Sequence, residues 1–160
     1  MRKTFSVFAL AAALFTIAAA GRRGHYRTNG SALLPDPAIT PGATIPGITA
    51  VRLCRPGYAA GKRHLDAAGK RRVYREYGAR PRPGVCCEVD HLVSLELGGS
   101  NALANLWPQP YMPPPGAHEK DLLEDYLHRE VCAGMLPLGV AQAELRQDWV
   151  RYWRAMPTHQ

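Results

Sequence analysis

The sequence predicts an α+β domain built around two short strands and flanked by helices. Three observations support this fold class. The run CCEVDHLVSL is short and partly β-branched, as a strand would be, and the extended segment NLWPQPY follows it after the Gly98-Gly99 pair. Three segments carry apolar residues at helical spacing. The chain has 160 residues, which is enough for one domain of this kind.

The three helices are expected over residues 66–78, 117–131 and 139–154. The first begins at the N-cap candidate Asp66 and ends at Gly78. Each helix has an apolar stripe at spacings of four residues. The stripe residues, in chain order, are Val73 and Tyr77, then Leu123, Leu127 and Val131, then Ala141, Leu145, Trp149 and Trp153. Trp107, followed by Pro108 in the second extended segment, is also expected to anchor the core.

The N-terminus is expected to lie outside this domain. Residues 1–20 place Arg2 and Lys3 before an uncharged apolar run that ends in alanines, the layout of a secretory signal peptide. A membrane anchor is the alternative, but about 16 apolar residues are short for a spanning helix. Residues 21–50 are rich in proline and glycine without apolar periodicity, which predicts a flexible leader. The folded domain is therefore expected over residues 51–160, with no stable membrane insertion.

Charge and cysteines limit the possible partners and compartment. The chain carries 20 Lys and Arg against 13 Asp and Glu, which favours polyanions such as nucleic acid or an anionic envelope surface. The segment around residues 62–75 is the most basic, and it fits either a phosphate-binding face or a solvated helix. The cysteines are Cys54, Cys86, Cys87 and Cys132. Without a CxxC pair they suggest disulfides, and export to the periplasm or medium, rather than structural zinc.

The cysteine pairing has three formal solutions. A bond between neighbours is geometrically strained. At least one of Cys86 and Cys87 is therefore expected to reach a distant partner or stay free. The prediction is a bond between Cys54 and Cys132.

Three side chains are expected to converge where the first strand ends. Asp90 and His91 lie at that end, and His118 starts the following helix. A carboxylate and an imidazole suit a divalent cation that keeps open positions for water and phosphate. A neutral histidine beside it could remove the proton of an attacking water. By themselves these residues are also compatible with ordinary hydrogen-bonded side chains, and Lys120, Asp121 and Glu124 with local ion pairs on the helix.

The run EVDHLVSLELGGSNALANLWPQPY, residues 88–111, resembles the ββα-metal core of the HNH endonuclease superfamily, and in particular an exported bacterial subgroup with the pattern DH, LELGGSN and NLWP. The resemblance extends over most of the chain after the leader, through CRPGY, VYREYG, AHEKDLLE, LHREVCAG and AQAELRQDWVRY. It implies an α+β fold with a ββα-metal core and additional flanking helices. Disulfides would replace the zinc-binding cysteine pairs of many such nucleases.

The resemblance also implies a role for each site residue. Asp90 binds the metal, His91 is the general base, Asn105 braces the loop, and His118 completes the metal site. Asp121 is the alternative to His118, because the insert at residues 113–116 lengthens the loop before the helix. The expected cofactor is one divalent metal ion, Mg, Mn, Ni or Zn.

The function expected from the sequence is metal-dependent hydrolysis of phosphodiester bonds in nucleic acid, with DNA favoured over RNA as the partner. The alternative is a non-catalytic exported module that uses the same scaffold to bind nucleic acid or an anionic envelope polymer. The sequence does not indicate an oligomeric state.

Overall fold

The computed structural model describes residues 23–82 and 86–157, so the predicted signal peptide lies outside the described residues. The fold is α+β, as predicted, with small antiparallel sheets and flanking helices. Two 3₁₀ turns, η1 (Leu95–Leu97) and η2 (Leu103–Asn105), lie between the third and fourth strands. The strands and helices in chain order are β1 (Arg27–Asn29), β2 (Ala32–Leu34), α1 (Ala50–Leu53), α2 (Ala67–Tyr77), β3 (Glu88–His91), β4 (Leu106–Gln109), α3 (Ala117–Cys132) and α4 (Leu138–Ala155).

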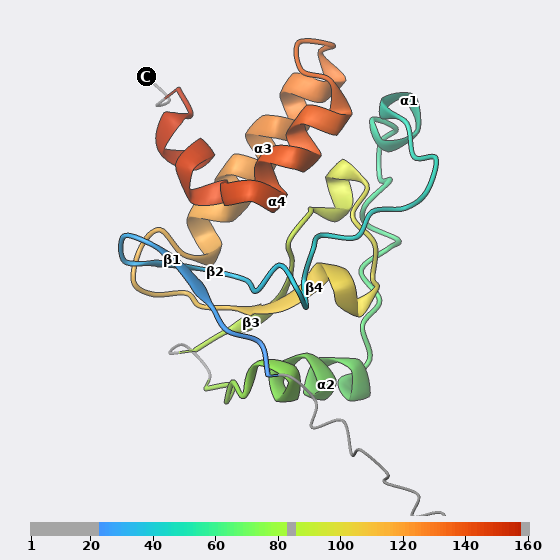
Figure 1. The fold of residues 1–160 in the computed structure, drawn as a ribbon. Helices are drawn as coiled ribbons and strands as arrows, with labels where there is room; N and C mark the ends of the chain where they lie inside the picture. The colour runs from blue at the N-terminus through green and yellow to red at the C-terminus, as the bar shows by residue number, and fades with distance from the viewer. Residues whose placement is uncertain (1–22, 83–85, 158–160) are drawn as a thin grey trace, which may run out of the picture.

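The antiparallel pair β3–β4 lies at the centre of the molecule. Its register aligns Asp90 with Trp107 and His91 with Leu106. Figure 1 shows α2 on one side of this pair and the side-by-side helices α3 and α4 on the other. Pro108 is accommodated in β4 opposite Val89, because a two-stranded ladder leaves the other edge of the strand unpaired. The chain therefore runs from strand to strand to helix around the end of β3.

The helices agree with the sequence patterns. Asp66 caps α2 by accepting a hydrogen bond from the Gly69 N–H at 2.7 Å, and Gly78 ends it in the left-handed conformation with φ 63°. The predicted stripes of α2 and α3 are buried, as are Ala141, Leu145 and Trp149 of α4. Trp153 is only partly buried, and α4 departs from helical geometry at Asp148. Trp107 is fully buried, which confirms its predicted place in the core.

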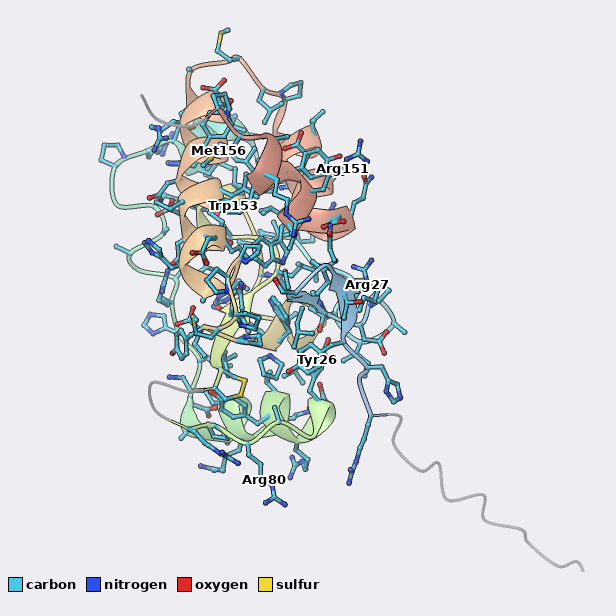
Figure 2. The ribbon with its side chains drawn as sticks, turned by 90° about the vertical axis from the view of Figure 1, so that its left-hand side faces the viewer. Tyr26, Arg27, Arg80, Arg151, Trp153 and Met156 are labelled. Carbon is cyan, nitrogen blue, oxygen red and sulfur yellow. A yellow bond between two sulfur atoms is a disulfide. The ribbon has the colours of Figure 1, made fainter. Side chains whose placement is uncertain are left out.

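The N-terminal segment differs from the predicted flexible leader. Residues 27–34 form the β1–β2 hairpin, in which Ala32 and Leu34 are buried. The Tyr26 hydroxyl donates to the Pro108 carbonyl at 3.0 Å, and Figure 2 shows Tyr26 and Arg27 between α2 and the C-terminal helix. Buried Thr40 donates to the Leu106 carbonyl at 3.0 Å. Isolated apolar residues and hydrogen bonds to distant strands hold this segment, and neither produces a local periodicity in the sequence.

Both disulfides form within the chain. Cys54 is bonded to Cys132, as predicted, with Cα atoms 5.6 Å apart, and this bond ties α1 to the end of α3. The expectation that Cys86 or Cys87 would find a distant partner or stay free is wrong, because these neighbours are bonded to each other. Cys87 adopts a positive φ of 67°, and its carbonyl accepts a hydrogen bond from Tyr74 of α2 at 3.1 Å.

Within residues 23–82 and 86–157, no helix combines the length and the apolar character needed to cross a bilayer.

Candidate functional site

A cleft of about 770 Å³ opens where β3 ends. Its walls come from β3, the turn η1, helix α3, and the segment that leads into α2. Of the four predicted site residues, Asp90 and His91 line it. The other lining side chains that can carry charge are Arg63, Lys70, Tyr74, Glu88, Glu96, Tyr111, Asp121, Glu124 and Asp125. The cleft therefore combines one histidine, a group of carboxylates and two basic side chains.

Asp90 is held by two donors that reach one of its oxygens. Its Oδ2 atom accepts from the Trp107 indole Nε1 at 3.1 Å and from the Lys120 ammonium at 2.8 Å. Within residues 23–82 and 86–157, no hydrogen bond reaches its Oδ1 atom. The fully buried Trp107 indole thus helps to fix the orientation of the Asp90 carboxylate, and its Oδ1 atom remains free for another ligand.

Lys120 is a buried cation next to the cleft, behind the Asp90 carboxylate. Its side chain is 1% exposed, and its ammonium donates to Asp90 Oδ2, to the His91 carbonyl at 2.8 Å and to Glu124 Oε1. Burial would lower the pKa of Lys120, but Asp90 and Glu124 outweigh that effect and raise it above its usual value. The i,i+4 pair with Glu124 was expected from the sequence, but as a solvated pair on the helix surface. Instead, Lys120 joins α3 to the end of β3.

The carboxylates of the cleft carry more negative charge than Lys120 offsets. Burial raises the pKa of Glu88, and repulsion from Asp90 and Asp121 raises it further. Burial likewise raises the pKa of Asp121, with Asp90 adding to the shift. The pKa of Glu124 is also raised by burial, although Lys120 opposes the shift. A bound cation would relieve this repulsion, because it favours the ionised form of every neighbouring carboxylate.

His91 is half-buried and has one side-chain partner. Its Nε2 atom lies 2.8 Å from Asn101 Oδ1. Burial lowers the pKa of His91 below its usual value; Asn101 and Asp90 act in the opposite direction, while Lys120 and Arg63 lower it further. The ring is therefore neutral at pH 7, which is the form that can accept a proton.

Asn105 holds the loop between the strands. It is fully buried: its Oδ1 accepts from the Val93 N–H at 2.9 Å, and its Nδ2 donates to the carbonyls of Val93 and Ser100, both at 2.9 Å. A Cβ atom on Gly99 would lie 1.8 Å from the Val93 carbonyl oxygen, so only glycine fits this close approach. These contacts correspond to the bracing role expected for Asn105, which acts on the loop and not in the cleft.

His118 stands apart from the other predicted site residues. It is exposed in the first turn of α3 and does not line the cleft. The end of β3 meets α3 at Lys120, so the helix residues beside and beyond that contact face the cleft. The structure thus brings Asp121, the alternative ligand, into the cleft with Asp90, and leaves His118 outside it.

The basic segment divides between the cleft and the surface. Arg63 and Lys70 line the cleft. Lys62 stacks its ammonium 4.7 Å from the centre of the Tyr58 ring, and Arg72 pairs with Glu76 at 3.1 Å on the exposed face of α2. Part of this segment is therefore an ordinary solvated helix face, and part of it lies beside the carboxylates.

A second group of metal-ligand types lies near α1. Ligand atoms of Cys54, His128 and Cys132 lie within 4.8 Å of one another, so this group could hold a metal ion. The two sulfur atoms, however, are bonded to each other, and thiolates are the form that ligates metals. Only the reduced protein would therefore offer all three ligands.

The sequence patterns did not predict the contacts of two residues next to the cleft. Asn101, in the GGSN motif, had no predicted role although it contacts His91, and burial of Lys120 depends on contacts with β3 that have no local signal. The remaining question is whether known proteins share this arrangement. No family model, no curated protein and no solved structure matches the chain.

Proposed function

We propose that the protein is a metal-dependent endonuclease of the HNH type that hydrolyses phosphodiester bonds in nucleic acid. The observation that carries this proposal is the joint placement of Asp90 and His91 in one cleft with the carboxylates of α3. The order β3, β4, α3 around that cleft supports a ββα-metal core. The sequence resemblance supports the same core independently of the cleft.

The donor set of the cleft fits a hard divalent cation such as Mg²⁺ or Mn²⁺. Asp90 offers a free Oδ1 atom, and Asp121 offers a second carboxylate in the same cleft. Burial and repulsion from neighbouring carboxylates raise the pKa values of Glu88 and Asp121, and a bound cation would offset that repulsion. When bound, the metal would supply positive charge to the phosphate and to the departing oxygen. His118 is a candidate ligand only if the first turn of α3 moves.

His91 would act as the base for the attacking water. The water oxygen forms a new bond to phosphorus, its proton passes to the neutral imidazole, and the bond from phosphorus to the departing sugar oxygen breaks. That oxygen then takes a proton from solvent. A neutral ring at pH 7 has the protonation state that this step requires.

Arg63 and Lys70 would bind the phosphates of the substrate beside the acidic centre. Both line the cleft, and a basic chain favours a polyanion. Duplex DNA is the proposed substrate ahead of RNA. Cleavage should weaken as salt rises, because each phosphate contact releases counterions.

Export to the periplasm or medium belongs to the same proposal. Two disulfides are typical of proteins that fold in an oxidising compartment. Residues 1–20 have the layout of a signal peptide.

The test is cleavage of plasmid DNA and of a structured RNA by the wild-type chain with Mg²⁺, Mn²⁺, Ni²⁺ or Zn²⁺. His91→Ala should lower the rate by about 100-fold or more while the protein stays folded and still binds DNA. His25→Ala is the matched control, since His25 is exposed and outside the cleft. Equal rates for wild type and His91→Ala would refute the proposed base.

One observation favours the alternative of a non-catalytic binding module. Lys120 already places a positive charge 2.8 Å from Asp90 Oδ2, as a protein without a metal would require. Such a module would bind nucleic acid or an anionic envelope polymer through Arg63 and Lys70. It should bind DNA equally well with and without divalent metal, and neither wild type nor His91→Ala should cleave it.

A further inference from the structure

We propose that Asn101 is a positioning residue that keeps the proton of the neutral His91 ring on Nε2 and so makes Nδ1 the basic nitrogen of the cleft. The location of this proton follows from the hydrogen bonds around the Asn101 amide. Its consequence for catalysis rests on the proposed nuclease function. The two parts can be tested separately.

The orientation of the Asn101 amide is fixed by a partner on each side. Its Nδ2 group donates to the Lys62 carbonyl oxygen at 2.7 Å, and its Oδ1 faces His91 Nε2 at 2.8 Å. The reversed amide would place Oδ1 at 2.7 Å from the Lys62 oxygen, and two acceptors with no proton between them repel each other. Lys62 therefore determines which end of the amide His91 meets.

The proton of the ring follows from that orientation. Oδ1 of an amide can only accept, so His91 must donate from Nε2 to make the 2.8 Å contact. A neutral imidazole carries one proton, and Nδ1 is then the nitrogen with the free lone pair. Within the part of the chain that the structure describes, Nδ1 has no hydrogen-bond partner. His91 lines the cleft, so Nδ1 is the ring nitrogen available to a water there.

The loop that carries Asn101 is held on its N-terminal side. Ser100 donates its N–H to the Ala43 carbonyl at 3.0 Å, and its own carbonyl accepts from buried Asn105 at 2.9 Å. Asn105 thus affects His91 indirectly, because it holds the loop that carries Asn101. Asn101 itself is exposed, so its side chain contributes little burial to the fold.

The direct test is nitrogen-15 NMR of the histidine rings in the full chain, with the His91 signals assigned by their absence from His91→Gln. In the neutral wild-type ring, Nε2 should carry the proton, and that proton should exchange slowly enough to be observed. Asn101→Ala should lose the protected signal, whereas Asn29→Ala, at an asparagine away from the cleft, should retain it. A wild-type proton on Nδ1, or an unchanged protected signal in Asn101→Ala, would overturn the proposal.

The catalytic part is tested by steady-state cleavage. Asn101→Ala should lower kcat by about 10- to 100-fold with little change in KM, a range typical of groups that orient a functional histidine. Asn29→Ala is the matched control, because this asparagine also makes two side-chain hydrogen bonds, but to Asp148 and Arg154 away from the cleft.

The possible failures are distinguishable. If the NMR signature changes in Asn101→Ala while kcat does not, Asn101 is not a positioning residue for catalysis. If wild type cleaves no nucleic acid, the nuclease proposal fails, and the NMR result still decides where the His91 proton lies.

Discussion

The apolar and the charged side chains of α3 differ in what they contact and in how far the sequence predicts them. Leu123, Leu127 and Val131 pack in the core. Lys120 is buried on the same side of the helix, and the carboxylates of α3 line the cleft beside it. The apolar side chains need only the right spacing along the helix, because hydrophobic burial is not directional. The charged side chains need partners at fixed distances, and those partners come from β3.

The difference teaches where the stability and the chemistry of this helix lie. Removing methylene groups from the apolar side chains should weaken the fold and leave the chemistry of the cleft unchanged. Removing a charge from α3 should change the balance among Asp90, Lys120 and Glu124. The predictions below test that separation, from the largest expected effect to the smallest.

Lys120→Met should lower the free energy of unfolding by about 3–5 kcal/mol at neutral pH, because it leaves buried carboxylates without their cation. The loss should shrink as the pH falls, because burial raises the pKa of Glu124 and its protonation removes an unpaired buried charge. Chemical denaturation at pH 5 and pH 7.5 measures both values. The double change Lys120→Met with Glu124→Leu should recover part of the loss. A single-variant cost below about 1 kcal/mol would show that Lys120 is a solvated residue.

Leu127→Ala should cost about 2–5 kcal/mol of stability through the cavity it leaves in the core. Leu122→Ala is the matched control on the same helix: Leu122 is 38% exposed, and its loss should cost within about 0.5 kcal/mol. Urea denaturation of both variants gives the comparison. DNA cleavage by folded Leu127→Ala should equal that of wild type, and a specific loss of kcat would contradict the separate roles of the apolar and the charged side chains.

Removal of each disulfide should lower the free energy of unfolding by a different amount. Removing the Cys54–Cys132 bond, with a sequence separation of 78, should cost about 2–4 kcal/mol, because the unfolded chain regains much freedom. The Cys86–Cys87 bond closes almost no chain, so its removal should cost less than about 1 kcal/mol by the same argument. Paired serine substitutions and thermal denaturation test this order. The reverse order would contradict the chain-entropy explanation.

Asp121→Asn should raise the stability of the metal-free protein at pH 7 by at most about 1 kcal/mol, given its partial exposure to solvent. The pKa of Asp121 is raised in the folded state, so the folded protein holds its proton more tightly than the unfolded chain does. Ionisation therefore costs stability as pH rises through the folded pKa. The gain should shrink as the pH falls and vanish below about pH 3, where Asp121 is protonated in the folded and in the unfolded state.

The same variant tests the metal. Added Mn²⁺ should raise the melting temperature of wild type more than that of Asp121→Asn. An equal rise would exclude Asp121 as a ligand.

The sequence predicted the parts of the fold that depend on local patterns. Asp66 and Gly78 define the ends of α2, and the periodic leucines of α3 define its buried face. The packing of residues 23–50 was missed, because Tyr26 and Thr40 are held by hydrogen bonds to β4, far along the chain. Local periodicity carries no information about such contacts.

The candidate site was predictable only where its residues are close together in the sequence. Asp90 and His91 are adjacent in the sequence and had to lie together at the end of β3. The position of His118 relative to them depends on which turn of α3 meets β3, and the Lys120 contacts determine that turn. Asn101 acts through an amide orientation that the Lys62 carbonyl sets from 39 residues away.

The most direct test of the proposed metal-dependent chemistry is the rate of DNA cleavage as a function of Mn²⁺ concentration, for wild type and Asp90→Asn. The proposal predicts cleavage that rises with Mn²⁺ and saturates in wild type. In Asp90→Asn the rate should fall by about 100-fold or more, or saturate only at much higher Mn²⁺, while the fold is retained. Identical metal dependence and rate in the two proteins would contradict the assignment of Asp90, and with it a metal-dependent nuclease centred on this cleft.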